Sequence, residues 1–94
     1  MNLEIKKDLV SNWFKTLQKA FCEDISKIEK NKSKFRSTTW KRNSTKDEGG
    51  GEYKILKNGK IFEKVGVNFS KVYGKFPKQF QKNILGAKKD PRFW

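Results

Sequence analysis

The stretch YKILKNGKIFEKVGVNFSKVY, residues 53–73, decides the fold of this chain. Short apolar and β-branched runs, separated by glycine and asparagine, are typical of strands joined by tight turns. The Asn58-Gly59 dipeptide is a strong hairpin signal, because both central residues of a type I′ turn need a positive φ. We therefore predict three antiparallel strands, at about 53–57, 60–66 and 67–73.

A two-residue turn also predicts the register of the first hairpin. Counting outward from Asn58-Gly59 sets apolar against apolar and cation against anion, as cross-strand pairs prefer. The predicted pairs are Leu56 with Ile61, Ile55 with Phe62, and Lys54 with Glu63.

A long amphipathic helix is predicted upstream, over residues 5–30. Apolar residues recur there every three or four positions, which is the period of a helix with one apolar stripe. The stripe comprises Ile5, Leu9, Trp13, Leu17, Phe21, Ile25 and Ile28. We expect this stripe to pack on the strands. The fold class is therefore α+β, with a long N-terminal helix plus antiparallel strands.

The region between helix and strands is polar and contains a glycine-rich loop, predicted at 43–52. Gly49, Gly50 and Gly51 permit backbone angles closed to other residues and the close approach of another chain or ligand. A plain flexible linker is the alternative. The run is not a phosphate-binding P-loop, because no Gly-Lys-Ser/Thr follows it.

Length and composition exclude several kinds of protein. The chain has 94 residues, one cysteine and no histidine, which allows at most one domain and no internal disulfide. Serine–histidine triads and histidine-ligated zinc are excluded. No apolar run approaches the length of a membrane span, and the N-terminus lacks the apolar core of a secretory signal. These features favour the cytoplasm.

The net charge of +13 favours a polyanionic partner or has no function beyond solubility. A small basic nucleic-acid-binding module is one alternative. Twenty of the 23 basic residues are lysines, whereas nucleic-acid interfaces favour arginine. No recognisable nucleic-acid-binding motif is present either, so nucleic acid is not the expected partner.

Residues 62–74, FEKVGVNFSKVYG, closely resemble the signature segment of oxygen-dependent coproporphyrinogen III oxidases. Trp40, Arg42, the glycines at 49–51 and the Asn58-Gly59 turn stand at that family's spacing, and the tail at 86–94 is similar to it as well. Glu48 departs from the pattern, because many members have a first glycine of four there. The resemblance covers nearly the whole chain.

The resemblance implies an enzyme of heme biosynthesis. Such enzymes oxidatively decarboxylate two propionates of coproporphyrinogen III to vinyl groups, giving protoporphyrinogen IX. Molecular oxygen is the oxidant, no metal or organic cofactor is implied, and the complete enzyme is a homodimer.

The resemblance also implies that residues 1–94 are the N-terminal part of one coproporphyrinogen-oxidase domain, and that their strands are part of a larger antiparallel sheet flanked by helices. The family's catalytic residues then lie beyond Trp94, and we expect no activity without the missing C-terminal portion. A piece that only completes a larger assembly is the remaining alternative. Candidate substrate-binding residues within the chain are Arg42, Gly49, Gly50, Gly51, Asn68 and Ser70.

Overall fold

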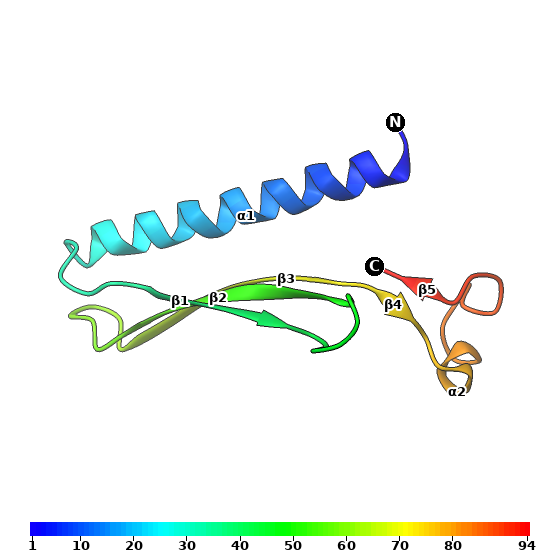
Figure 1. The fold of residues 1–94 in the computed structure, drawn as a ribbon. Coiled ribbons are helices and arrows are strands. Elements are labelled where there is room, and N and C mark those ends of the chain that lie inside the picture. The colour runs from blue at the N-terminus through cyan, green and yellow to red at the C-terminus, as the bar shows by residue number, and fades with distance from the viewer.

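A single long helix lies across a three-stranded sheet in the computed structural model, which describes all 94 residues (Figure 1). Helix α1 spans Leu3–Ile28. The side chain of Asn2 caps it by accepting a hydrogen bond from the Ile5 N–H at 2.9 Å, as N-cap residues do. Lys30 and Asn31 end it with φ values of 55° and 58°. The helix therefore begins and ends two residues before the predicted 5–30.

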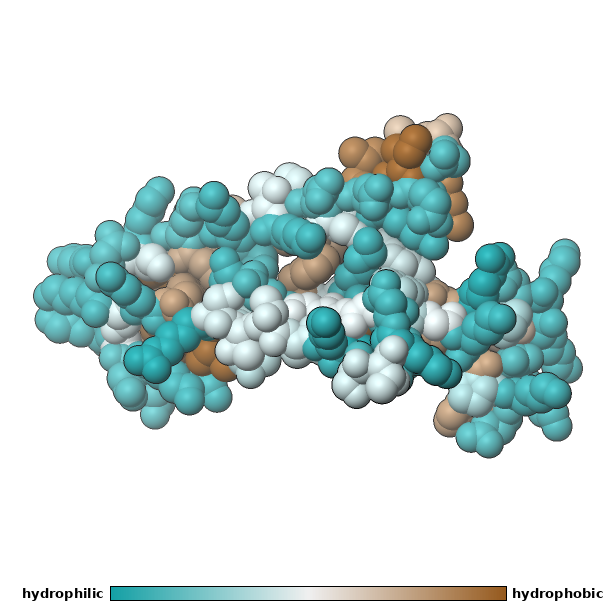
Figure 2. Space-filling view, viewed as in Figure 1, coloured by the Kyte–Doolittle hydropathy of each residue, from teal (hydrophilic) through white to brown (hydrophobic).

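The face that α1 turns toward the sheet is polar, which corrects the predicted packing. Its buried residues are Ser11, Gln18 and Cys22, whereas much of the apolar stripe is half exposed, including Trp13 and Phe21. The reason is the chemistry of the contact. The Gln18 side chain donates hydrogen bonds to two backbone carbonyls of the sheet, at 2.9 and 3.0 Å. Figure 2 shows an apolar patch where α1 begins.

The main sheet is antiparallel in the order β1-β2-β3. Its strands are β1 (Arg36–Lys41), β2 (Gly49–Lys57) and β3 (Lys64–Val72). The α+β class is confirmed, but the strand bounds differ from the prediction. Strand β1 was not predicted, β2 starts within the expected loop, and the strands expected at 60–66 and 67–73 are one continuous strand.

The register of the β2–β3 hairpin also differs from the prediction. Leu56 pairs with Val65 rather than Ile61, Ile55 with Gly66 rather than Phe62, and Lys54 with Val67 rather than Glu63. Residues 58–63 form a wider loop, in which Asn58 has a φ of 56° but Gly59 does not take a positive φ. The two-residue type I′ turn is therefore wrong.

The carboxylate of Glu29 explains the wider loop. It accepts hydrogen bonds from the backbone N–H groups of Lys60, Ile61 and Phe62 at 2.7, 2.8 and 2.7 Å. The Glu29 side chain is only 2% exposed, and these bonds, that of Phe62 first, lower the pKa of its carboxyl below the ordinary value. A group at the end of α1 thus sets the hairpin register.

A small second sheet carries the C-terminal end. Strands β4 (Gly74–Lys75) and β5 (Arg92–Phe93) are antiparallel, and the short helix α2 (Lys78–Gln81) lies between them in the chain. The rings of Phe76 and Phe93 stack with centroids 4.7 Å apart. No helix of the structure has the length and apolarity needed to cross a membrane.

Candidate functional site

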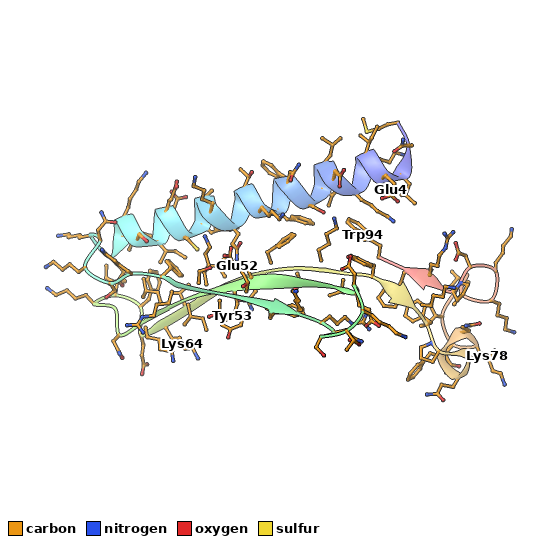
Figure 3. The ribbon with its side chains drawn as sticks, viewed as in Figure 1. Glu4, Glu52, Tyr53, Lys64, Lys78 and Trp94 are labelled. Atoms are coloured by element: carbon orange, nitrogen blue, oxygen red, sulfur yellow. The ribbon has the colours of Figure 1, made fainter.

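A basic groove lies between α1 and the sheet. Its volume is about 850 Å³, within the usual range for a small-molecule site. Figure 3 shows Glu52 on the helix-facing side of the sheet and Tyr53 on the opposite side, as the alternation of strand side chains requires. The loop at 42–48 closes one end of this basic groove.

Six lysines line the basic groove against two acids. The lysines come from α1, β1, the loop, β2 and β3: Lys15, Lys19, Lys41, Lys46, Lys54 and Lys71. The acids are Asp47 and Glu52, which leaves a formal surplus of four positive charges. Lys54 lies 4.0 Å from Glu52, and Lys15 lies 5.7 Å from the centre of the Phe69 ring. The lining therefore favours an anionic ligand.

Asp47 is held by Tyr73, the residue between β3 and β4. The hydroxyl of Tyr73 donates a hydrogen bond to its carboxylate, and the Gly49 N–H donates another at 3.4 Å. The bond from Tyr73, chiefly, lowers the pKa of Asp47, and Asp47 in turn raises the pKa of Tyr73. Asn43 fixes the rest of the loop by accepting bonds from the backbone of Thr45 and Lys46.

The three predicted glycines line the basic groove, but from a strand. Gly49, Gly50 and Gly51 open β2, so the predicted loop at 43–52 is shorter than expected. A Cβ atom on them would lie 2.0, 2.1 and 2.2 Å from a backbone oxygen of a neighbouring strand. These glycines are therefore needed for strand pairing, and their close approach is to β1 and β3.

Arg42 lies beside the basic groove and is engaged within the chain. Its guanidinium donates a hydrogen bond to the Tyr73 carbonyl at 3.1 Å and lies 3.6 Å from the Glu48 carboxylate. It also sits 5.1 Å from the centre of the Phe93 ring. These contacts tie the loop to Tyr73, between β3 and β4, and to β5. The role of Arg42 in substrate binding stays a prediction.

Asn68 and Ser70 are not brought together with the glycines in the basic groove. Both are exposed on the side of β3 turned away from α1, and their side chains make no hydrogen bond within the chain. They border a smaller depression of about 240 Å³ beside the edge of β3. Their role in binding also stays a prediction.

The lysines of the basic groove are the residues that the sequence reasoning missed. Lys15 and Lys19 are four residues apart and so share one face of α1, which is a signal that the sequence offers. Lys41 lies on a strand that was not predicted, and Lys46 lies in the predicted loop, whose position beside the sheet depends on that strand. No group of three His, Cys, Asp or Glu side chains gathers as a metal site would require.

Comparison with known proteins gives one consistent result. The family model described as Coproporphyrinogen III oxidase matches residues 9–93. The oxygen-dependent coproporphyrinogen-III oxidase of Rickettsia typhi is 41% identical over all of this chain and 35% of that protein. The protein of the same name from Rickettsia akari is 40% identical, over 93% of this chain and 33% of that protein. No solved structure matches with significance. The chain spans about a third of the length of these relatives.

Proposed function

The chain belongs to the coproporphyrinogen III oxidase family, and from that premise we propose that it supplies the N-terminal part of an oxygen-dependent coproporphyrinogen III oxidase in heme biosynthesis. Each of two propionates loses carbon dioxide and two hydrogen atoms and becomes a vinyl group. The hydrogens reduce one molecule of oxygen to hydrogen peroxide each time. We propose that oxygen is the oxidant and that neither a metal nor an organic cofactor takes part.

The basic groove carries the proposal for what this part of the enzyme does. Coproporphyrinogen III has four carboxylates, and six lysines against two acids complement a multiply charged anion. Positive charge around a cleft also raises the rate at which an anion arrives. We assign the capture of substrate carboxylates to the groove. We assign a catalytic step to no residue of this chain.

The three glycines support this use of the groove. They leave the start of β2 without side chains where it lines the cavity, so a flat macrocycle meets backbone there instead of bulk. Lys41 and Lys71 stand on the strands at either side of that bare stretch, opposite Gly50 in the two registers. A carboxylate placed over Gly50 has an ammonium group on each side.

The test is a fluorescence titration with coproporphyrin III, the stable oxidised porphyrin that carries the same four carboxylates. Lys41→Gln with Lys71→Gln is expected to weaken binding about tenfold, because each lost ionic contact at a partly exposed site is worth about 0.5–1 kcal/mol. The matched control is Lys78→Gln with Lys82→Gln, which removes the same charge from α2 and the residues after it.

Two results contradict the assignment. Equal weakening by both pairs of substitutions means that only net charge matters. Binding of duplex DNA as tight as that of the porphyrin, with loss of both on Lys41→Gln and Lys71→Gln, favours the nucleic-acid-binding alternative.

The complete enzyme is proposed to be a homodimer in the cytoplasm, as the family resemblance implies. We expect the 94 residues alone to give no turnover, measured as oxygen uptake and protoporphyrin fluorescence after oxidation. Addition of the remaining portion of the Rickettsia typhi relative is expected to restore it. Robust turnover by the chain alone would overturn this division of labour.

A further inference from the structure

The carboxylate of Asp47 shares the basic groove with Lys41 and Lys71. These two lysines stand on the strands at either side of β2, and neither forms an ion pair within the chain. Their charges nonetheless reach Asp47. After the hydrogen bond from Tyr73, which has the largest effect, Lys41 and Lys71 also lower the pKa of the Asp47 carboxyl. A carboxylate of the chain itself therefore already lies in the field that would attract an anionic ligand.

Two hydrogen-bond donors hold Asp47 in this position. The Tyr73 hydroxyl donates to Oδ1 of Asp47, and the Gly49 N–H donates to the same oxygen at 3.4 Å. Tyr73 follows Lys71 by two residues, so the two side chains lie on the same side of the extended chain. A hydroxyl, a backbone N–H and two ammonium groups are the kind of donors that a bound carboxylate uses. Asp47 occupies the first two of them.

The segment that carries Asp47 can release these donors without disturbing the sheet. The backbone of residues 44–47 makes no hydrogen bond to any strand, and its local bonds go to the side chain of Asn43. Asp47 itself is exposed. Rotation of its side chain away from Tyr73 therefore leaves every strand pair intact.

We propose that Asp47 is an internal competitor for the anion position of the basic groove, and that a substrate carboxylate displaces it on binding between Lys41 and Lys71. The Tyr73 hydroxyl then donates to the incoming carboxylate instead of to Asp47. The identity of the ligand rests on the proposed function, whereas the competition rests on the contacts of Asp47. This makes Asp47 a specificity-determining residue of the groove.

Such a competitor selects for ligands that carry several carboxylates. A group tethered by a short loop competes at an effective concentration in the millimolar range, so a weakly bound monocarboxylate does not displace it. A ligand with further carboxylates also contacts other lysines of the groove, including Lys15 and Lys19 of α1. Those contacts offset the loss of the two bonds to Asp47. The four carboxylates of coproporphyrinogen III meet this requirement.

The experiment compares Asp47→Asn with a matched control, Glu48→Gln, in titrations with coproporphyrin III and with the tricarboxylate citrate. Asparagine keeps the shape of the side chain and removes its charge. Glu48 is the neighbouring acid and does not line the groove, because its carboxylate lies 3.6 Å from the Arg42 guanidinium. Porphyrin binding is followed by fluorescence, and citrate binding by the NMR shift of the Gly49 amide.

Asp47→Asn is expected to tighten the binding of both probes about tenfold, since a position that is free about a tenth of the time weakens the apparent affinity by that factor. Glu48→Gln is expected to stay within about twofold of the parent chain, because a charge outside the groove is screened. In a chain that also carries Lys41→Gln and Lys71→Gln, Asp47→Asn is expected to give no gain, because the contested position is gone.

Three outcomes overturn the proposal. Equal gains from Asp47→Asn and Glu48→Gln mean that only net charge matters. Unchanged or weaker binding by Asp47→Asn means that the residue only supports its loop. An undiminished gain in the chain without Lys41 and Lys71 places the competition elsewhere. Failure of the proposed function looks different: citrate binding is tightened by Asp47→Asn, as the proposal expects, while coproporphyrin III binds to neither chain.

Discussion

Gly50→Ala tests whether the glycine run is required by strand pairing. A Cβ atom at this position would lie 2.1 Å from the Trp40 carbonyl oxygen and 3.1 Å from the Lys41 Cα. Close carbon–oxygen contacts between strands are normally about 3.3–3.6 Å, so β1 must move away from β2 by about 1 Å. The obstructing atoms are backbone and cannot rotate aside. We expect a loss of about 1–3 kcal/mol in the free energy of unfolding, as for other overpacked sites.

The matched control is Gly66→Ala on β3. A Cβ there meets only the Asn68 side chain, at 3.9 Å, and φ is not in the left-handed region. We expect this variant to be unchanged or stabilised by about 0.4–1 kcal/mol, because alanine restricts the unfolded chain.

Urea unfolding followed by tryptophan fluorescence measures both variants, since Trp40 stands on β1 opposite Gly51. With a slope of about 1–3 kcal/mol per molar urea, Gly50→Ala is expected to lower the midpoint by about 1 M or to abolish the transition. A Gly50→Ala midpoint equal to that of Gly66→Ala would refute the steric reasoning.

Three further perturbations follow from the hydrogen bonds. The lowered pKa of Glu29 means that its carboxylate stabilises the fold at pH values above the ordinary pKa of 4.5, and that this stabilisation is lost as pH falls through the folded pKa. Glu29→Gln should therefore lower Tm at neutral pH and flatten the dependence of Tm on acid pH. An unchanged curve of Tm against pH contradicts this expectation. Gln18→Ala leaves two carbonyls of the sheet without their side-chain donor and should lower the free energy of unfolding in urea by about 1–3 kcal/mol. The exposed control Asn12→Ala should lower it little. Equal losses in the two variants count against the hydrogen bonds between α1 and the sheet. Tyr73→Phe removes the main hydrogen bond to Asp47 and should raise the pKa of that carboxyl in an NMR titration, and a constant pKa shows that the bond is absent in solution.

The sequence predicts local structure well where the signal is local. The extent of α1 follows from its periodic stripe, to within two residues at each end, and the α+β class follows from a helix beside strands. The hairpin register does not, because it depends on Glu29, which reaches Phe62 from 33 residues away. Asn58-Gly59 carries the signal of a tight turn, but three hydrogen bonds to a buried carboxylate outweigh it.

The candidate site is likewise predictable only where its signal is local. Gly49, Gly50 and Gly51 are recognisable as positions of close approach, but only the strand registers show that they approach β1 and β3. The inward face of α1 cannot be predicted from hydrophobicity alone. The Gln18 amide donates hydrogen bonds to two carbonyls of the sheet, and these bonds turn a polar face of the helix toward the sheet in place of the apolar stripe.

The glycine run has a consequence for the gene that encodes it. Every missense change in a glycine codon adds a Cβ atom, and at Gly49, Gly50 and Gly51 that atom meets a neighbouring backbone oxygen. Any missense change in these three adjacent codons is therefore expected to destabilise the strand pairing. Glu48, immediately before them, has its carboxylate 3.6 Å from the Arg42 guanidinium at a half-exposed surface, so its codon is open to drift.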